Sequence, residues 1–535
     1  MIANHRAEAV AALLLLLVSF TPSAPGDDIT TITAVATPTQ HDESPILSSL
    51  PAHVPTEKGA GPLKLHRVKP LPPLPERVQF KGQSTPLART VEQTAASFTL
   101  SITPIEGFAG IGDGKAYRVE HAPSDTAGAI GDTQYVQWVN EALQIFDRNG
   151  SSQYGPTLGN TLWKGFTGNC QDLNDGDPIV QYDKLAGHWL LSQFAYRHGP
   201  PFFQCVAVSQ TSDARGKYFR YAFSFPKFND YPKIAVWPSE YYFSFNMFEA
   251  DETPIGSKIC ALNRADVIAG KATIAQCFDV PSFGVLPADF DGMRVPPMDG
   301  PAYAMSFTRD ALLLWEIRID WKDITKSRMT GPKVIKVAPF EEACPNRQPC
   351  IPQPPPEPGA DAPLFSLGDR LMYRVVYRNF GDYESLLLDH SVATASGQKQ
   401  PSGIRWYEIR NPRAAKPLVR QQSTYAIDGL ARWLGSIGMD KEGNMLVGFS
   451  ASSSKLFPAI RLAGRSAGDT VNMLSREINV VSGKATALGG SWGDYSTMSI
   501  DPTDDCTFWF TTEYMGSVDD AWQTYIAHTK FRDCK

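Results

Sequence analysis

Short runs of apolar and aromatic residues recur along most of the chain, and the first run of each repeat follows a turn that ends in Gly-Asp or a close relative. Examples are TQYVQWV after Gly131-Asp132 and PIVQYD after Gly176-Asp177, each followed by further apolar runs. Long amphipathic helical windows are almost missing. The turns of the seven repeats lie at Asp132, Asp177, Asp230, Gly292, Asp369, Gly435 and Asp494.

The repeats are spaced roughly 45 to 75 residues apart, and units of a few strands near this period are typical of β-propellers. One unit cannot bury both of its faces alone, whereas radial stacking of several units buries them. The pattern therefore predicts an all-β fold, with a seven-bladed β-propeller over residues 96–535. A six- or eight-bladed propeller is an alternative. A β-sandwich plus accessory domain is another, although it does not explain the recurrence.

The first 95 residues differ from the rest of the chain. A cationic start, an apolar run from Ala9 to Phe20 and the small residues after it are typical of a secretory signal, so residues 1–24 are expected to be a signal peptide. The run is too short for a transmembrane span. Residues 25–95 are rich in proline and poor in aromatics, which predicts a disordered linker or pro-segment. The protein is therefore expected to be secreted, either to the extracellular space or to the periplasm.

The composition of the chain argues against some classes of function. The chain has 50 Lys and Arg against 56 Asp and Glu, a formal net charge of -6, which argues against a nucleic-acid partner. Hydrophobic residues make up 42% of the chain, enough for a large core. The 42 glycines and 42 prolines favour turns over helices. The sequence has no P-loop, dinucleotide fingerprint or H-E-x-x-H motif, so no cofactor is expected to be required.

The eight cysteines suggest disulfides, because their number is even and the compartment is expected to be oxidising. Their grouping along the chain favours pairing between neighbours, with each bond closing one hairpin or loop. The metal-site alternative is weak, because the sequence has no C-x-x-C pair and no His at ligand spacing. The expected pairs are Cys170–Cys205, Cys260–Cys277, Cys344–Cys350 and Cys506–Cys534.

The segment SIDPTDDCTFW, from Ser499 to Trp509, is similar to the Asp-box of sialidase-type propellers, which runs Ser-x-Asp-x-Gly-x-Thr-Trp on a turn between two blade strands. The box is degenerate, because Asp-Cys stands where Asp-Gly is expected and Phe508 is inserted. With DPIVQYD, SLGDRLMYR and GIRWYEIR, the stretch WGDYSTMSIDPTDDCTFWFTTEY also resembles exported bacterial β-propeller proteins of unassigned activity. The resemblance implies fold and export. An Asp-box is structural and implies no catalytic residue.

Acidic residues at the starts of predicted inner strands are the most informative feature for ligand binding. If these strands line the channel of the propeller, their carboxylates and nearby guanidinium groups form a ring at one channel end. Such a ring can hold a sugar or its carboxylate, because Arg makes paired charge-assisted hydrogen bonds. The alternative is that each Asp caps its own turn. The candidate ligand-binding residues are Asp132, Asp177, Arg294, Asp369, Arg370, Arg432 and Asp494.

Catalysis at the same channel mouth is a second hypothesis, and whether the protein is an enzyme is left open. A sialidase-like glycoside hydrolase would use a Tyr nucleophile, a nearby Glu and an Arg cluster. The candidate catalytic residues are Tyr495, Glu513 and Asp494, with Arg405, Arg370 and Arg432 as candidate substrate contacts. A polysaccharide lyase would need a Tyr or His base, and the available histidines are His188, His198 and His390.

Ca²⁺ is the one metal that the sequence suggests. The oxygen-rich turn at Asp172, Asn174 and Asp175 partly resembles the opening of a calcium loop, although the spacing is one residue short and the expected Glu is missing. A second acidic cluster consists of Asp501, Asp504 and Asp505. The alternative for both clusters is that these acids lie on solvated turns.

Together these observations predict a secreted, monomeric β-propeller that acts as an extracellular binding or adhesion module for a glycan or a protein. The alternative is a carbohydrate-active enzyme, either a sialidase-like glycoside hydrolase or a polysaccharide lyase, with its site at the channel mouth.

Overall fold

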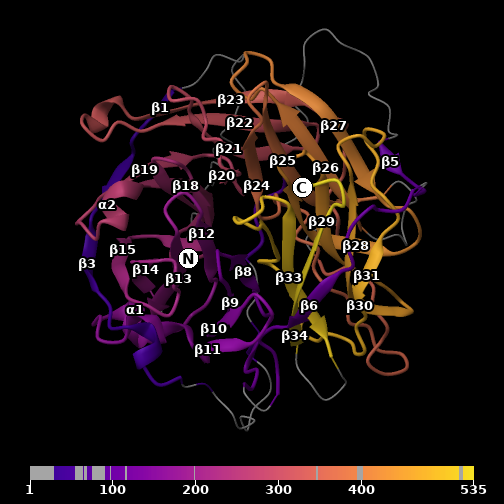
Figure 1. The fold of residues 1–535 in the computed structure, drawn as a ribbon, viewed down its shortest axis with the longest axis horizontal. Helices are drawn as coiled ribbons and strands as arrows, with labels where there is room; N and C mark the ends of the chain where they lie inside the picture. Colours follow the sequence, from indigo (N-terminus) through magenta and orange to yellow (C-terminus); the bar gives the residue numbers. More distant parts are fainter. Residues whose placement is uncertain are drawn as a thin grey trace, which may run out of the picture.

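A computed structural model describes residues 29–535 except 53, 55–63, 66–68, 75–90, 97, 115–116, 198, 345–347, 395–401 and 517–521. The predicted signal peptide therefore lies outside the described residues. Strands dominate the fold and surround a central axis (Figure 1). The helical segments are short: α1 (Asn169–Asp172), α2 (Arg264–Ile268), η1 (Leu47–Ser49), η2 (Gly159–Trp163) and η3 (Ile324–Lys326). Within the described ranges, no helix is long and apolar enough to cross a membrane.

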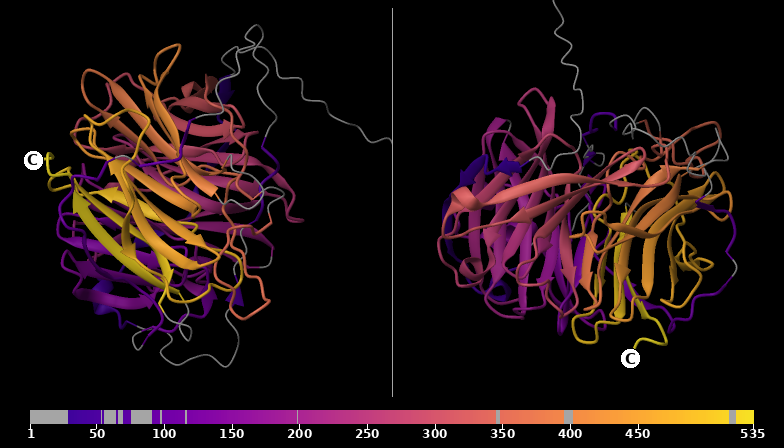
Figure 2. Two further views of the ribbon diagram at one scale, coloured as in Figure 1. Left: turned by 90° about the vertical axis from the view of Figure 1, so that its right-hand side faces the viewer. Right: turned by 90° about the horizontal axis from the view of Figure 1, so that it is seen from above.

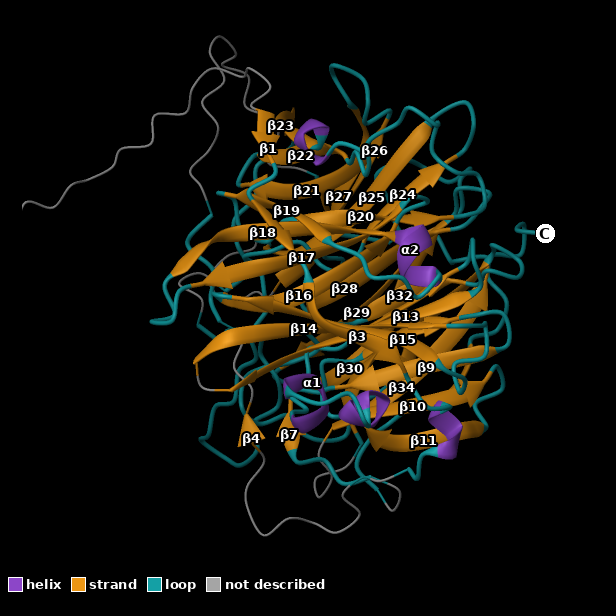
Figure 3. Ribbon diagram, turned by 90° about the vertical axis from the view of Figure 1, so that its left-hand side faces the viewer, coloured by secondary structure: helices purple, strands orange, loops and turns teal. Residues whose placement is uncertain are grey.

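The strands pair as antiparallel meanders of four, which lie around the axis in chain order (Figure 1), and Figure 3 shows the strands from the side. The first two meanders are β8 (Ala127–Ile130), β9 (Gln134–Val139), β10 (Ala142–Asp147) and β11 (Ser152–Leu158), then β12 (Ile179–Asp183), β13 (His188–Arg197), β14 (Gly199–Ser209) and β15 (Tyr218–Phe225). The next two are β16 (Phe228–Val236), β17 (Glu240–Phe248), β18 (Pro254–Asn263) and β19 (Ala275–Val280), then β20 (Leu286–Asp291), β21 (Ala302–Thr308), β22 (Ala311–Arg318) and β23 (Arg328–Lys336).

Three further meanders complete the circle. The fifth and sixth are β24 (Val375–Asn379), β25 (Glu384–Ala393), β26 (Ser402–Arg410) and β27 (Leu418–Tyr425), then β28 (Ala431–Met439), β29 (Met445–Ser453), β30 (Leu456–Arg465) and β31 (Ile478–Val481). The last contains β32 (Thr497–Ile500), β33 (Thr507–Met515) and β34 (Trp522–Lys530), and its fourth strand is β6 (Glu106–Ala109) from the N-terminal side of the chain. The prediction of an all-β propeller is confirmed.

The circle closes because the two ends of the propeller domain share one sheet. β6 pairs antiparallel with β34, with Gly107 opposite Ala527. The inner strands β8, β12, β16, β20, β24, β28 and β32 are neighbours in this order, and β32 returns to β8. β20 and β24 pair directly and in parallel, with Ala288 opposite Val375, and so join two meanders into one sheet. Since each meander starts at the axis and runs outward, the starts of the inner strands lie at one end of the channel.

The segment expected to be a disordered linker differs from that prediction in its first part. β3 (Pro38–Glu43), β2 (Ala34–Ala36) and β1 (Ile29–Thr31) add outer strands to the meanders that end in β15, β19 and β23. Figure 1 shows this indigo segment along the outside of the ring, and Figure 2 gives two side views. The correction has a physical reason: outer strands leave backbone N–H and C=O groups unpaired, and an extended segment satisfies them whatever its side chains.

Two other strands of the N-terminal segment are short. β5 (Glu92–Gln93) pairs in parallel with the outer strand β27, and β4 (Lys64–Leu65) pairs with β7 (His121–Ala122). Thus the described parts of residues 25–95 run along the propeller and are bonded to it at several places. Together they contact at least four of its meanders.

Large side chains fill the space between adjacent meanders. The fully buried aromatics include Trp138, Trp163, Trp189, Trp406, Trp433 and Trp509. Tilted pairs such as Trp138 with Trp163, at a centroid distance of 6.0 Å, have the geometry that aromatic rings favour. The sheets are therefore buried on both faces, which explains why the strands appear in the sequence as short apolar runs rather than as strict alternation.

The four expected disulfides are present: Cys170–Cys205, Cys260–Cys277, Cys344–Cys350 and Cys506–Cys534. Each joins segments that are close in the chain, and the sequence separations range from 6 to 35 residues. Cys260 and Cys277 lie opposite each other on the neighbouring strands β18 and β19. The pairing inferred from grouping along the chain is confirmed.

Candidate functional site

A left-handed backbone residue lies just before or within the first half of several inner strands, at the same end of the channel. Asp125 has φ 45°, Asp177 has φ 47° and Tyr231 has φ 55°. Aspartate adopts this region more readily than most non-glycine residues, because its short side chain can bond to the local backbone. Asp177, one of the recurrent acids of the sequence, therefore has a backbone role in its turn, as Asp125 has before β8.

This end of the channel contains a group of ionisable and phenolic side chains, which we call the channel-end cluster. Its members come from the turns before β8, β12, β24 and β32 and from strands β16 and β33. They are Asp125, Asp177, Asp230, Tyr231, Lys233, Arg370, Asp494, Tyr495 and Glu513.

Lys233 lies at the centre of the cluster. Its Nζ is 3.1 Å from the centroid of the Tyr495 ring and 3.5 Å from that of the Tyr231 ring, so the ammonium lies between two aromatic faces. The two rings are 5.2 Å apart. Cation–π attraction stabilises the charge in this place, and it does so more strongly where water is excluded. Lys233 is only 1% exposed.

Arg370 continues the same arrangement on the other side of Tyr231. Its guanidinium carbon is 4.5 Å from the Tyr231 ring centroid, and its Nε donates to Asp369 at 2.8 Å. The Tyr231 hydroxyl donates to the backbone carbonyl of Asp494 at 3.0 Å. The Tyr495 hydroxyl donates to a carboxylate oxygen of Asp177 at 2.5 Å. The rings are thus fixed at both ends and hold the two cations in place.

The acids of the cluster hold protons at a pH where carboxyl groups are normally ionised. Burial raises the pKa of Asp177 to about 8, with Asp230 acting in the same direction and Tyr495 and Lys233 in the opposite one. Burial likewise raises the pKa of Asp494 to about 7 and that of Glu513 to about 8. Burial lowers the pKa of Lys233 well below its usual value. The cluster can therefore both donate and accept hydrogen bonds near neutral pH.

Three buried polar atoms of the cluster have no hydrogen-bond partner among the described residues: Lys233 Nζ, Asp125 Oδ1 and Arg370 Nη1. Buried polar groups in folded proteins are nearly always hydrogen-bonded, because an unpaired group loses its hydration without compensation. Three such atoms in one cluster mark a place that a polar ligand or ordered water can satisfy.

A stretch of the N-terminal segment lies against this end of the channel. Arg370 donates to the Lys69 carbonyl at 3.2 Å, and the Leu71 N–H donates to Asp369 at 3.2 Å. Lys69 Nζ lies 2.8 Å from a carboxylate oxygen of Glu252 and 4.7 Å from the Phe228 ring centroid. The cluster is therefore framed partly by the propeller and partly by residues 69–71.

A groove of about 330 Å³ adjoins the cluster between the second and third meanders. Its aromatic walls come from β13, β14 and β16, and Asp230 follows Phe228 on the same strand. Burial raises the pKa of Tyr196 to about 12, and Asp177 and Asp230 are among the nearby carboxylates that act in the same direction. The lining residues are Lys69, Tyr196, Gly199, Phe202, Phe228, Glu249, Ala250 and Glu252.

The structure brings together only part of the ring expected from the sequence. Asp177, Asp369, Arg370 and Asp494 lie at one channel end. Asp132 lies at the other end, because it follows β8 rather than preceding it. There it accepts a hydrogen bond at 2.7 Å from Tyr182, near the end of β12. The recurrent Gly-Asp turn therefore stands on opposite sides of the inner strand in different repeats.

Arg294 and Arg432 are also outside the cluster. Arg294 is exposed in the loop after β20, at the opposite end of the channel. Arg432 begins β28 at the correct end, but its guanidinium pairs with Asp428 and Glu477, each at 2.8 Å. The Arg432 guanidinium is thus used in these ion pairs and does not belong to the expected ring.

The expected catalytic constellation is only partly assembled. Tyr495 is bonded to Asp177, whereas Glu513 accepts hydrogen bonds from the backbone N–H groups of Gly493 and Ser124. Arg405 lies within the fifth meander, where it donates to Thr424 and to a backbone carbonyl. Tyr495, Glu513 and Arg370 thus share the cluster, although each has its own partner, whereas Arg405 lies outside it.

The histidines considered for a lyase base lie away from the cluster. His188 contacts the Ser209 carbonyl at the start of β13, near the opposite channel end. His390 is buried between Phe307, Phe340 and Tyr407, and burial lowers its pKa well below the usual value. His198 lies outside the described residues.

The acids considered for Ca²⁺ bind separate partners in the first of the two turns. Asn174 contacts backbone groups of Asn160 and Glu141, Asp175 accepts from the Tyr196 N–H, and Asp172 faces Arg197. The described residues contain no group of three or more His, Cys, Asp or Glu side chains that could hold a metal. A Ca²⁺ site stays a prediction.

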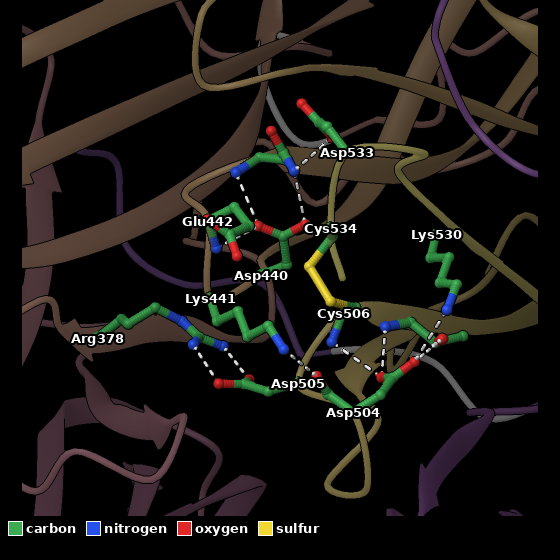
Figure 4. Close-up of a disulfide and its surroundings, with 12 residues drawn as sticks. Arg378, Asp440, Lys441, Glu442, Asp504, Asp505, Cys506, Lys530, Asp533 and Cys534 are labelled. Atoms are coloured by element: carbon green, nitrogen blue, oxygen red, sulfur yellow. Dashed lines mark hydrogen bonds and ion pairs between the residues drawn. A yellow bond between two sulfur atoms is a disulfide. The ribbon is translucent and has the colours of Figure 1, made fainter.

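In the second turn each acid has its own partners, and Figure 4 shows those of Asp504 and Asp505. Asp504 accepts from the N–H groups of Cys506 and Thr507, both at 2.9 Å. Asp505 forms a bidentate pair with Arg378 at 2.6 and 2.8 Å. Asp501 accepts from Trp509 Nε1 at 3.1 Å. These bonds fix the turn that resembles a degenerate Asp-box.

Sequence reasoning missed the centre of the cluster. Lys233, Tyr231 and Asp125 were not among the candidates, although the repeat at Asp230-Tyr231 was recognised. The available signal was a lysine inside the apolar run PKIAVW, since a charge within a buried strand is rare unless it has a specific role. The strand bulge between Asp230 and Lys233 turns that lysine toward the channel.

The strand pairing places the chain in the class of β-propellers, with a polar cluster at one end of the channel. No protein-family model and no curated protein sequence matches the chain. Among solved structures it is similar to the GH93 α-L-arabinofuranosidase of Fusarium graminearum with arabinobiose, at 8% identity, covering 78% of this chain and 97% of that one with a TM-score of 0.37.

Two further structures are similar at the same level. One is an ulvan lyase of family PL25, at 10% identity, covering 78% of this chain and 94% of the other with a TM-score of 0.33. The second is the Dos1 propeller, at 8% identity, covering 74% and 75% with a TM-score of 0.34.

Proposed function

We propose that this protein is a secreted β-propeller that binds an uncharged extracellular glycan at the channel-end cluster. The observation that carries the proposal is the Lys233 side-chain nitrogen, which is buried between two tyrosine rings and has no hydrogen-bond partner among the described residues. A sugar hydroxyl is a suitable partner, since it accepts from Lys233 and donates to a carboxylate in the same cluster. The four disulfides support secretion.

The charges of the cluster favour an uncharged sugar over an acidic one. Five carboxyl groups face two cations, and Asp369 already neutralises Arg370. An acidic ligand would therefore meet additional carboxyl groups, whereas hydroxyl groups can bond to protonated and ionised carboxyls alike. The aromatic groove beside Asp230 provides apolar surface for the C–H faces of neighbouring sugar units.

The proposal is tested by measuring binding to a panel of neutral and acidic oligosaccharides with wild type, Lys233→Met and Tyr495→Phe. We expect saturable binding to at least one neutral glycan, and about tenfold weaker binding for Lys233→Met, because a hydrogen bond to a charged group contributes about 1.5–3 kcal/mol. Tyr495→Phe removes only the hydroxyl that orients Asp177 and is expected to weaken binding less.

Lys455→Met is the matched control, because Lys455 is exposed on the turn between β29 and β30 and is not a member of the channel-end cluster. It is expected to bind as wild type does. Equal affinity in wild type and Lys233→Met, with both proteins folded, contradicts the proposal, and so does a preference for acidic glycans that Lys233→Met leaves unchanged.

A glycosidase is the second candidate, favoured by the proton that Asp177 holds at neutral pH while bonded to Tyr495. A carboxyl group with a raised pKa is the usual general acid of glycoside hydrolysis. This candidate predicts new reducing ends when the bound glycan is incubated with wild type, and their loss in Asp177→Asn while binding persists. Binding without turnover contradicts the glycosidase and agrees with the binding function.

A further inference from the structure

A second polar pocket lies between the fifth and sixth meanders, at the opposite end of the molecule from the channel-end cluster. It is formed where β26, β28 and β30 end and where β27 and β29 begin. Its cavity volume is about 30 Å³, which is room for two or three water-sized groups. The lining residues are Tyr383, Glu408, Arg410, Arg420, Gln421, Met439, Gly443, Met445, Arg465 and Ala467.

Three guanidinium groups line this pocket with one carboxylate. Glu408 is the acid, and its oxygens are already occupied by Arg410 Nε and Gln421 Nε2, each at 2.6 Å. The Arg410 guanidinium lies over the Tyr383 ring, 3.8 Å from the centroid. Such stacking holds a guanidinium in a fixed orientation and leaves its outer N–H groups free to donate.

Arg465 is the buried member of the three. It is 2% exposed, its Nη2 donates to the backbone carbonyls of Asp469 and Ala467, and its Nε has no hydrogen-bond partner among the described residues. Asp469 uses a carboxylate oxygen to accept from the Ser466 N–H at 2.7 Å. Burial lowers the pKa of Arg465, the carboxylates of Asp469 and Glu408 oppose that shift, and the charges of Arg420 and Arg410 add to it. The three guanidinium groups therefore outnumber the two carboxylates, Glu408 and Asp469, that lie near them.

Arg420 completes the pocket from the solvent side. It is exposed on β27, and within the described part of the chain no hydrogen bond or ion pair engages it. An exposed arginine above a buried one, with a stacked third beside them, matches the fork geometry that binds oxyanions through paired N–H donors.

We propose that this pocket binds a single oxyanion group, a sulfate, phosphate or carboxylate, either free or carried on an extracellular polysaccharide. The site is separate from the channel-end cluster, and its proposed ligand is an anion, whereas that of the cluster is an uncharged sugar. The unpaired N–H groups of Arg465, Arg410 and Arg420 would supply the donors. Glu408 would hold Arg410 and Gln421 in position through the two hydrogen bonds that it accepts.

The test is a calorimetric titration at constant ionic strength with inorganic sulfate, glucose 6-sulfate, glucuronate and, as the uncharged control, glucose. We expect saturable one-to-one binding of at least one anion and none of glucose. Arg420→Gln is expected to weaken anion binding about tenfold, which is the loss of one charge-assisted hydrogen bond. Arg532→Gln, which removes an exposed arginine elsewhere, is the matched control and should bind as wild type does.

The ranking of sulfate against glucose 6-sulfate distinguishes a free anion from a sugar-borne group, and either ranking supports the pocket. No saturable binding of any anion overturns the proposal, and so does an equal loss in Arg420→Gln and Arg532→Gln. Arg465→Gln is a second variant, and the exposed Arg420 decides the outcome should that buried change unfold the protein. Lys233→Met is expected to leave anion binding unchanged, so this proposal can fail independently of the glycan site.

Discussion

Lys233 illustrates how a single residue acquires its meaning from the fold. In the chain it is one cation within an apolar run, and in the structure it is enclosed by two tyrosine rings and near several carboxyl groups. The acids that the sequence did single out have two uses. Asp177 forms the left-handed turn before β12 and also accepts from Tyr495, so turn capping and ligand binding are compatible explanations of the same residue.

The buried acids predict a pH dependence of stability. The pKa of Glu513 is raised to about 8 from an ordinary value of 4.5. The folded state therefore holds a proton that the unfolded state releases, and this stabilisation is full below about pH 4.5 and is lost as the pH rises through about 8. We expect the free energy of unfolding to fall between pH 5 and pH 9.

Glu513→Gln is expected to reduce that fall by an amount on the order of 1 to 4 kcal/mol, because the amide cannot ionise yet its oxygen still accepts from the Gly493 N–H. Urea unfolding at several pH values measures the effect. Glu357→Gln, at an exposed loop position, is the control and should follow the wild-type curve. A Glu513→Gln curve parallel to the wild-type curve contradicts the assignment.

At the scale of elements, the short strand β6 closes the ring. It belongs to the N-terminal side of the chain and completes the sheet that the C-terminal strands begin. Its backbone approaches β34 so closely that a Cβ atom on Gly107 would lie 2.3 Å from the Ile526 carbonyl oxygen. A glycine is therefore required at this position even though it is exposed.

Gly107→Ala is expected to lower the free energy of unfolding by about 1–3 kcal/mol, the usual cost of forcing extra volume against a fixed backbone. Denaturant unfolding of the variant beside wild type measures the change. The control is Gly429→Ala, another exposed glycine, whose added Cβ would meet nothing within 4 Å. Equal stability of the two variants shows that β6 can shift without loss.

At the scale of the whole molecule, the N-terminal segment acts as an outer band. β1, β2 and β3 cover the edges of three successive meanders in reverse order, so one extended stretch crosses from sheet to sheet. Exposed sheet edges promote self-association, because their unpaired backbone groups can pair with another chain. The band therefore protects the edges of β15, β19 and β23.

We expect a chain that begins at residue 51 to self-associate, whereas a chain that begins at residue 29 stays monomeric, since only the second retains β1 to β3. Size-exclusion chromatography with light scattering separates the two outcomes. A monomeric, equally stable chain from residue 51 contradicts a protective role for the band.

The sequence by itself determined the class of fold and the disulfides, because both depend on features that are local in the chain. Apolar runs at a recurrent spacing specify strands that must stack, and cysteines close in sequence meet within one hairpin or loop. The sequence also indicated three acids and one arginine of this channel end, because they occupy the recurrent turns: Asp177, Asp369, Asp494 and Arg370.

Only the tertiary structure decided which of these side chains meet. A turn motif does not reveal whether it precedes or follows the inner strand, so Asp132 and Asp177 look alike in the chain yet lie at opposite channel ends. The pocket of Arg410, Arg420 and Arg465 lies between neighbouring meanders, so the sequence of a single repeat does not indicate it. The band of β1 to β3 uses backbone hydrogen bonds, which no side-chain pattern records.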